Sequence, residues 1–304
     1  MPSGAIILFQ TAAPMASSTR SAKRSLSEEE RLERLLRVGT CLAQCGYGTH
    51  WQAGQLAATA RAFRGDAQLW TAQARHRGPR SRTLLMQAAR RGDVPRIQFL
   101  LERGAGVEEA TVSRTTALMW ASVEGRSEAA RFLVERGGAD VNAGRSTDGK
   151  TALMFASLRG RLETVLFLVE RGGANVNART DDGQTALMSA SEQGHQETVR
   201  FLVERGGANV NAASVTDGMT SLMFASQHGR LETVRYLVER GGANVNAART
   251  TDGVTALMWA SGQGRLETVR LLLLHGADKQ AADSAGRTAC YYASAHPLVL
   301  AALA

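Results

Sequence analysis

The sequence is poor in aromatic residues and cysteines, and it contains no long apolar run. Aromatic residues make up 5% of the 304 residues and hydrophobic residues 44%, so small and aliphatic side chains must fill the interior. No stretch approaches the roughly 18 apolar residues that suggest a membrane-spanning helix. The three cysteines are an odd number without disulfide-like spacing, which suits a reducing compartment. We therefore expect an intracellular, cytoplasmic protein without a transmembrane segment.

Positive charge is concentrated at the N-terminus. Residues 1–82 hold 12 Lys+Arg against 5 Asp+Glu, whereas residues 83–304 hold 24 against 23. Nucleic-acid sites need clustered positive charge, so the near-neutral second part argues against nucleic acid as its partner. The basic N-terminus leaves one alternative open, that this part of the chain binds nucleic acid or a membrane surface.

Residues 1–82 are predicted to divide into two segments. Residues 1–26 are expected to be disordered, and the absence of acidic residues from 1–24 leaves organelle targeting open. Residues 27–82 are predicted to form a helical cap or small helical module, followed by a basic linker. Its three predicted helices end near Leu69–Trp70, and the segment is similar to an F-box. That similarity implies a second alternative, a substrate-recognition adaptor of a ubiquitin ligase.

The chain from residue 83 onward is built from repeats. A fixed period of about 33 residues is typical of solenoids, in which each repeat buries its apolar side against its neighbours. The sequence therefore predicts an array of about seven repeats over residues 83–304. Threonines open the successive copies at separations of 33, 35, 34, 35, 35 and 33 residues: Thr83, Thr116, Thr151, Thr185, Thr220, Thr255 and Thr288.

Each copy is predicted to contain two helices, as the copy from Thr151 to Ala178 illustrates. The first helix places Ala152 and Ala156 on one face and ends at Gly160. We expect the alanine at the position of Ala156 to lie where neighbouring helices approach closely. The second helix carries a single apolar stripe: Leu162, Val165, Leu168 and Val169.

The copies resemble ankyrin repeats. One copy reads GKTALMFAS and then RGRLETVLFLVERGGANVNA, against an approximate family pattern of G-x-T-P-L-H-x-A-A, G-H, V-x-x-L-L and G-A-D-x-N-A. The resemblance covers residues 83–304 and implies an all-α ankyrin-repeat solenoid of helix-turn-helix units joined by hairpin loops. Methionine replaces the family's loop-bridging histidine and cannot donate the same hydrogen bond. The six positions are Met86, Met119, Met154, Met188, Met223 and Met258.

No catalytic constellation is recognisable. None of the six histidines lies in a nucleophile, metal or phosphate-loop motif. Cys41, Cys45 and His50 supply three ligands without the further Cys or His that a structural zinc site needs. Recurrent Asp-Gly pairs, such as Asp148–Gly149, are typical of turns and lack the oxygen ligands of a calcium loop. We predict a non-catalytic protein without cofactor or metal.

The expected function is protein–protein interaction, as a scaffold or adaptor. The resemblance implies that the partner, an unidentified protein, binds the concave face of the array. The predicted partner-binding residues vary between copies or carry rings, although drift at exposed sites, or packing of the rings between helices, would also explain them. They are Trp120, Glu124, Lys150, Phe155, Leu158, Arg159, Gln184, Glu192, Gln193, Met219, Phe224, Gln227, His228, Val254, Trp259 and Gln263. The sequence does not indicate an oligomeric state.

Overall fold

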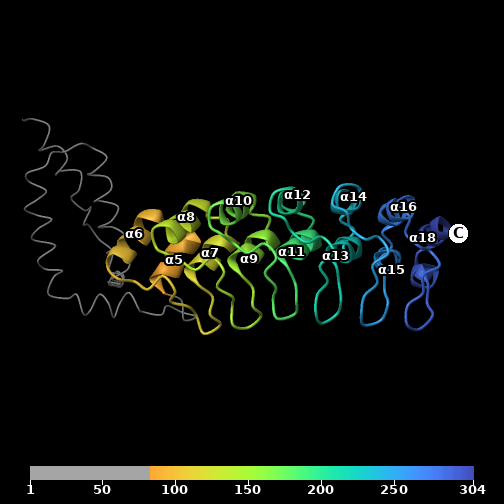
Figure 1. The fold of residues 1–304 in the computed structure, drawn as a ribbon, viewed down its shortest axis with the longest axis horizontal. Coiled ribbons are helices and arrows are strands. Elements are labelled where there is room, and N and C mark those ends of the chain that lie inside the picture. Colours follow the sequence, from red (N-terminus) through yellow and green to blue (C-terminus); the bar gives the residue numbers. More distant parts are fainter. Residues whose placement is uncertain (1–82) are drawn as a thin grey trace, which may run out of the picture. The chain divides into compact units, whose positions relative to one another are not determined.

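The computed structural model describes residues 83–304, which form two layers of helices (Figure 1). The first helix of each repeat lies in the inner layer: α5 (Leu84–Arg91), α7 (Ala117–Val123), α9 (Ala152–Leu158), α11 (Ala186–Gln193), α13 (Ser221–Gln227), α15 (Ala256–Gly262) and α17 (Ala289–Tyr292). The second helix lies in the outer layer: α6 (Val94–Glu102), α8 (Ser127–Glu135), α10 (Leu162–Glu170), α12 (Gln196–Glu204), α14 (Leu231–Glu239), α16 (Leu266–Leu274) and α18 (Pro297–Leu303).

Long hairpin loops connect each outer helix to the next inner helix (Figure 1). Within residues 83–304 the loops form isolated β-bridges, such as Ala213 with Thr220, and no strand. The all-α solenoid that the sequence predicts is thus confirmed. The predicted disordered segment, helical cap, F-box-like segment and Cys41–Cys45–His50 cluster lie outside the described residues.

The repeat threonine precedes every inner helix, and its side chain caps all of them except the last. Oγ1 of Thr151 accepts a hydrogen bond from the backbone N–H of Met154 at 3.4 Å, which satisfies one of the free amides of the first turn. The Thr151 N–H in turn lies 3.5 Å from Sδ of Met154, a weak acceptor. Met154 is 1% exposed, so the methionine both fills the core and helps to close the start of the helix.

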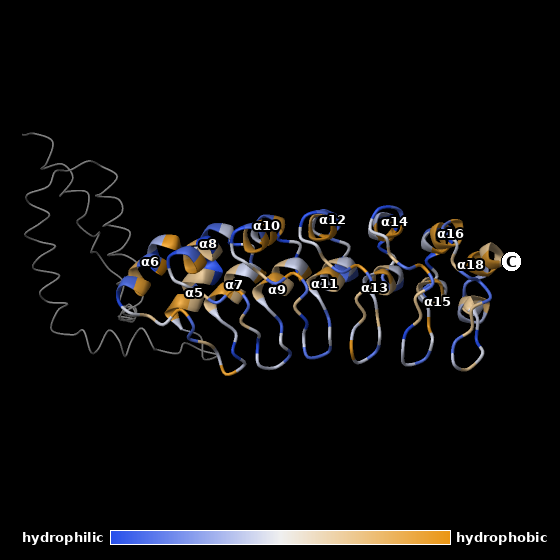
Figure 2. Ribbon diagram, in the orientation of Figure 1, coloured by the Kyte–Doolittle hydropathy of each residue, from blue (hydrophilic) through white to orange (hydrophobic). Residues whose placement is uncertain are grey.

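Alanines allow the inner helices to approach one another. Ala156, Ala190, Ala225 and Ala260 are all 0% exposed, as expected for positions between closely packed helices. Figure 2 shows hydrophobic colour concentrated on the helices and hydrophilic colour on most of the hairpin loops. The core therefore runs continuously between the two layers and from repeat to repeat.

The buried side of the outer helices differs from the predicted stripe. Val165 and Leu168 are fully buried, but Leu162 and Val169 are only half-buried. Thr164 and Phe167 are buried in their place, because α10 contacts α9 on one side and the neighbouring outer helices α8 and α12 on the others. An outer helix thus buries a wider arc than one heptad-like stripe.

A ladder of asparagines joins the loops that follow the outer helices. Nδ2 of Asn142 donates to the carbonyl of Gly173 at 3.2 Å, and its Oδ1 accepts from the backbone N–H of Asn175 at 2.8 Å. Each partner belongs to the next repeat, so one side chain links two repeats through both of its polar atoms. The asparagine ladder comprises Asn142, Asn177, Asn211 and Asn246, which make equivalent pairs of bonds.

Two glycines precede each ladder asparagine, and each is required for a different structural reason. A Cβ on Gly172 would lie 2.8 Å from the carbonyl oxygen of Leu168, which is too close for any other residue. Gly173 has φ +71°, in the left-handed region that favours glycine. The second glycine therefore sets the direction in which the loop leaves the outer helix.

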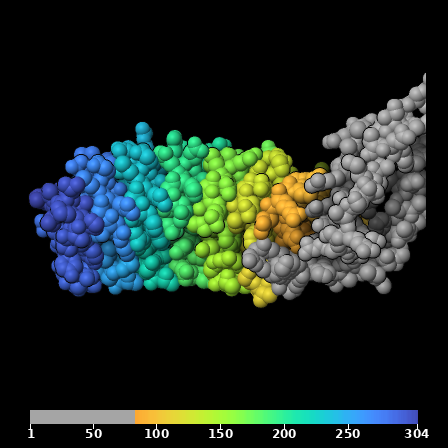
Figure 3. All heavy atoms as spheres, turned by 180° about the vertical axis from the view of Figure 1, so that it is seen from behind, coloured from red at the N-terminus to blue at the C-terminus, as the bar shows by residue number. Residues whose placement is uncertain are grey.

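The last repeat is irregular. Inner helix α17 has four residues and continues as a 3-10 turn over Ala293–Ala295, and Thr288 makes no side-chain cap. The outer helix α18 carries no charged residue and leaves Leu298 72% exposed. The space-filling view shows successive repeats as adjoining bands that end at this helix (Figure 3).

Candidate functional site

Most of the predicted partner-binding residues lie at the surface formed by the hairpin loops and the inner helices, which we call the inner face. Arg159 and Gln263 are exposed, and the rings of Trp120, Phe224 and Trp259 are half-buried. Leu158 and Arg159 follow Phe155 by three and four residues and so share its side of α9. The remaining half-buried members are Glu124, Lys150, Leu158, Gln184, Glu192, Gln193, Gln227 and His228.

Three predicted residues lie in the core instead of on the open surface. Met219 is 3% and Val254 4% exposed, because the backbone of each closes the base of its hairpin. The Met219 carbonyl accepts from the N–H of Ser214, and its N–H donates to Oγ of Ser214 at 3.0 Å. Phe155 is also buried, at 9% exposed. The prediction of Met219 and Val254 as contact residues is therefore corrected to a packing role.

An arginine from the hairpin covers the Phe155 ring. The guanidinium carbon of Arg145 lies 5.0 Å from the ring centroid, within the range of a cation–π interaction. Nε of Arg145 also donates to Oδ1 of Asp148 at 2.8 Å, and Nζ of Lys150 lies 3.7 Å from Oδ2 of the same carboxylate. The hydrogen bond from Arg145 holds the pKa of Asp148 below its usual value. Hairpin and inner helix are thus fixed to each other by a charged pair above a ring.

The same arrangement recurs at Trp259. The guanidinium carbon of Arg249 lies 5.4 Å from the Trp259 ring centroid, and its Nε donates to Oδ1 of Asp252 at 2.8 Å. The hydrogen bond from Arg249 lowers the pKa of Asp252. The indole Nε1 of Trp259 is buried and has no hydrogen-bond partner among the described residues. Trp259 is therefore held in place by ring contacts and not by its polar atom.

The last hairpin carries a similar cluster of aspartate, arginine and ring, in which the aspartate is more deeply buried. Asp283 is 6% exposed and accepts hydrogen bonds from Nε of Arg287 and from the Tyr292 hydroxyl, both at 2.7 Å. The Arg287 guanidinium lies 5.4 Å from the Tyr292 ring centroid. Burial alone would raise the pKa of Asp283, but the hydrogen bonds from Tyr292, Arg287 and the Ala285 backbone outweigh it and hold the pKa well below its usual range.

Sequence reasoning did not identify these three clusters. Arg145 and Arg249 belong to hairpin positions that vary between repeats, but their contact with a ring was not predicted. A usable signal exists for these two clusters, because Arg145 and Arg249 each precede an aspartate by three residues and a ring by ten. In the hairpin before the fifth repeat, Ser214 replaces the arginine and donates its hydroxyl to Asp217, which leaves Phe224 without this cover.

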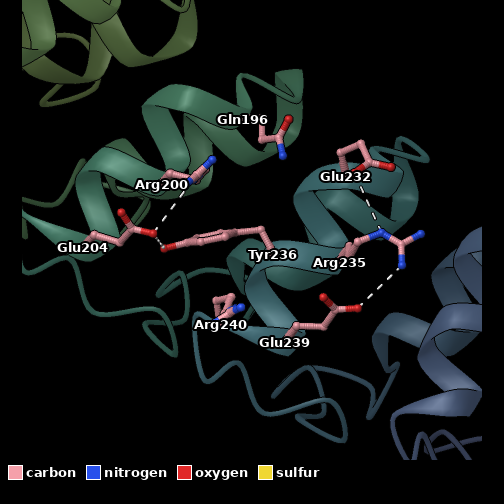
Figure 4. Close-up of a pocket in the computed structure, with 8 residues that line it drawn as sticks. All are labelled: Gln196, Arg200, Glu204, Glu232, Arg235, Tyr236, Glu239 and Arg240. Carbon is pink, nitrogen blue, oxygen red and sulfur yellow. Dashed lines mark hydrogen bonds and ion pairs between the residues drawn. The ribbon is translucent and has the colours of Figure 1, made fainter.

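A shallow cleft lies on the opposite, outer surface, between α12 and α14 (Figure 4). Its volume is ≈ 420 Å³, and its charges largely pair with one another. The Tyr236 hydroxyl donates to Glu204 at 3.3 Å, and Arg235 lies 3.8 Å from Glu232, as its i,i+3 spacing predicts. Burial, followed by the nearby Glu204 charge, raises the pKa of Tyr236. The lining residues are Gln196, Arg200, Glu204, Glu232, Arg235, Tyr236, Glu239 and Arg240.

The described part of the chain has no group of histidine, cysteine and acidic side chains that could hold a metal ion. No helix within residues 83–304 has the length and hydropathy to cross a bilayer.

Comparison with known proteins identifies the repeats. A family profile described as "Ankyrin repeats (3 copies)" matches residues 56–145, 85–180, 138–214, 173–249, 208–283 and 242–303. The human ASB11 ankyrin repeat domain is similar, with a TM-score of 0.65 and 27% identity over 73% of this chain and 96% of that one. The ankyrin repeat domain of Bcl-3, a member of the IκB family, gives a TM-score of 0.62 and 30% identity over 73% and 98%. No curated protein sequence matches the chain. The seven helix pairs, six of them capped by a threonine side chain, the asparagine ladder and these matches show that the chain belongs to the ankyrin-repeat family.

Proposed function

We propose that this chain is a non-catalytic scaffold or adaptor that binds a partner protein on its inner face. Ankyrin repeats are in general protein–protein interaction modules. The observation that carries the proposal is the contrast between the two layers. The three central outer helices are nearly identical, as LETVLFLVE, QETVRFLVE and LETVRYLVE show. The residues that differ between repeats instead gather on the inner face.

The ring clusters support the same face. A ring that is already held by an arginine and an aspartate loses little conformational freedom when a partner covers it. Aromatic and arginine side chains also dominate the binding energy of protein interfaces. Trp259 with Arg249 combines both kinds of side chain on a fixed support.

The test compares two triple alanine variants of the full chain. The inner variant changes Arg159, Gln193 and His228, which are polar and lie outside the core. The matched outer variant changes the exposed residues Arg200, Arg235 and Arg270. Surface changes of this kind usually alter stability by less than about 0.5 kcal/mol, so both variants should stay folded.

Proteins retained by the wild-type chain are identified by affinity purification and mass spectrometry, and their binding is then measured with both variants. The inner variant should lose the partner or bind it at least about ten-fold more weakly, because central contacts contribute about 2 kcal/mol or more. The outer variant should bind like the wild type. Loss of binding in the outer variant alone would place the working surface on the other layer.

A further inference from the structure

An arginine stands at the N-terminal cap of four outer helices. We call these four the arginine row: Arg126 before α8, Arg161 before α10, Arg230 before α14 and Arg265 before α16. None of them makes a side-chain cap to its own helix. The row lies at the turns between inner and outer helices, and therefore at the opposite end of the inner helices from the hairpin loops.

Three arginines of the row donate a hydrogen bond to the preceding repeat, and the fourth, Arg265, lies beside Gly229 of that repeat. Nε of Arg126 donates to the Arg90 carbonyl at 3.3 Å, and Nε of Arg161 to the Val123 carbonyl at 3.2 Å. Nε of Arg230 donates to the carbonyl of Glu192 at 3.0 Å. Three accepting carbonyls thus lie near the C-terminal ends of α5, α7 and α11.

Glycine makes room for these side chains. A Cβ on Gly125 would lie 2.6 Å from Cδ of Arg161, and one on Gly229 would lie 2.7 Å from Cδ of Arg265. His195 and His296 occupy the same place in the fourth and last repeats, and each Nε2 lies within hydrogen-bond distance of a carbonyl of the preceding repeat, at 3.2 and 3.1 Å. The aliphatic parts of the row arginines are therefore held in place, and the repeat geometry sets the distance between them.

The outer ends of the guanidinium groups have no acidic partner. Among the described residues, no carboxylate forms an ion pair with any of the four arginines, and their Nη atoms make no hydrogen bond. Arg126, Arg161 and Arg265 are exposed, and Arg230 is half-buried. A planar guanidinium bound only through Nε still offers four N–H donors, the set that binds a carboxylate or a phosphate in bidentate fashion.

The nearest acidic residues along the outer helices are engaged elsewhere. Glu128 lies 3.7 Å from Arg131, Glu232 lies 3.8 Å from Arg235, and Glu267 lies 3.0 Å from Arg270. Each of these pairs is formed on the outer surface, three residues along the same helix. The first-turn glutamates of α8, α14 and α16 therefore pair with outer arginines, whereas Glu163 of α10 has Leu166 in place of such an arginine and forms no ion pair with Arg161.

We propose that the arginine row binds an extended acidic segment of a partner protein, with carboxylates that meet successive repeats. Packed helices lie roughly 8–10 Å apart, and an extended chain covers that distance in about three residues. A peptide with one acidic side chain in every three would thus place one carboxylate at each repeat. The near-neutral composition of residues 83–304, with 24 Lys+Arg against 23 Asp+Glu, suits spaced carboxylates better than a continuous polyphosphate.

The test uses purified full-length protein and a fluorescent peptide in which Glu-Ser-Gly is repeated six times. The row variant combines Arg161→His, Arg230→His and Arg265→His, because histidine already occupies this place twice in the chain and keeps the bond to the preceding repeat. The control variant makes the same three changes at Arg200, Arg235 and Arg270 on the outer surface. Circular dichroism melts verify that both remain folded, and if the triple variant does not fold, each single change is measured instead.

The row variant should bind the peptide about ten-fold more weakly than the wild type at low salt, with a smaller salt dependence. The control should bind within about two-fold of the wild type, and each single row change should weaken binding about two-fold or more. Equal affinities of the row variant and the wild type would overturn the proposal, as would equal losses in both triple variants.

Two further probes test whether the row binds a spaced acidic peptide in preference to other anionic chains. A peptide of the same composition with all six glutamates in one block should lose less affinity in the row variant than the spaced peptide does. An equal loss of affinity for the two peptides would show that the arginine row does not recognise the spacing of the glutamates. A single-stranded oligothymidine of the same length should bind the row variant and the wild type alike. A larger loss for the oligothymidine than for the peptide would assign the row to nucleic acid and overturn the peptide assignment.

Discussion

The guanidinium of Arg249 lies over the ring of Trp259 while the same arginine pairs with Asp252. One side chain thus connects a hairpin loop, a turn and an inner helix. Arg145 makes the equivalent contacts with Phe155 and Asp148 three repeats earlier. These clusters give the hairpins fixed positions on the inner face without a core of their own.

Removing the Arg249 side chain should expose the Trp259 indole to solvent. Arg249→Ala is expected to shift the tryptophan emission to longer wavelength and to lower the free energy of unfolding by about 0.5–1 kcal/mol, the size of an exposed cation–π contact. The emission change should be absent when Trp259→Phe is already present. Arg179→Ala is the control, since Arg179 bonds the Ala213 carbonyl of the next hairpin. Unchanged emission of Arg249→Ala would contradict the stacked geometry.

The buried carboxylate of Asp283 should make stability depend on acid pH. Its pKa in the folded chain lies well below the value of about 3.9 in an unfolded chain. The ionised group therefore stabilises the fold above about pH 4, and this contribution is lost as the pH falls toward the folded pKa. Urea unfolding between about pH 5 and pH 2 should show a smaller loss of stability for Asp283→Asn than for the wild type. Parallel curves for the two proteins would exclude this role.

One member of the asparagine ladder can be tested against a neighbour. Asn211→Ala removes the bonds to the Gly242 carbonyl and the Asn244 amide in the next repeat, and should lower the free energy of unfolding by about 1–2 kcal/mol. Asn209→Ala is the control, because its Oδ1 accepts only from the Asn211 amide within its own repeat. Chemical denaturation should rank Asn211→Ala as the less stable protein. The reverse order would show that the links between repeats contribute little.

The small residues between inner helices should not tolerate enlargement. Ala225 is 0% exposed in the middle of the array, so Ala225→Leu should overpack α13 against its neighbours and cost about 1–3 kcal/mol. The melting temperature should fall clearly, whereas Ala248→Leu, at an exposed loop position, should leave it nearly unchanged. An unaltered melt of Ala225→Leu would mean that the inner helices pack less closely than the structure shows.

Repetition made the fold predictable from the sequence. The threonine spacing located the start of the inner helices, and the buried alanines were expected because small residues recur at one helical position. The buried arc of the outer helices was misjudged at Leu162 and Val169, because a stripe drawn on one helix ignores the neighbours on either side.

The inner face was predicted less well than the fold. Met219 and Val254 vary between repeats as contact residues would, yet variation alone cannot distinguish an open position from one that fits a particular hairpin. The arginine–ring clusters depend on how a loop folds back onto a helix ten residues later. Nothing in a helical period encodes that contact, and its sequence signal is the spacing of ten residues from Arg145 and Arg249 to their rings.

The asparagine ladder also has a mechanical consequence. Each rung joins only adjacent repeats, and no rung spans the array. Pulled from its two ends, the chain would lose one repeat at a time, with its rung and its share of the core, and each loss would free the 33 to 35 residues of one copy. The array would therefore extend in nearly equal steps under load and shorten again by the same steps when the load is removed, as a spring made of identical coils does.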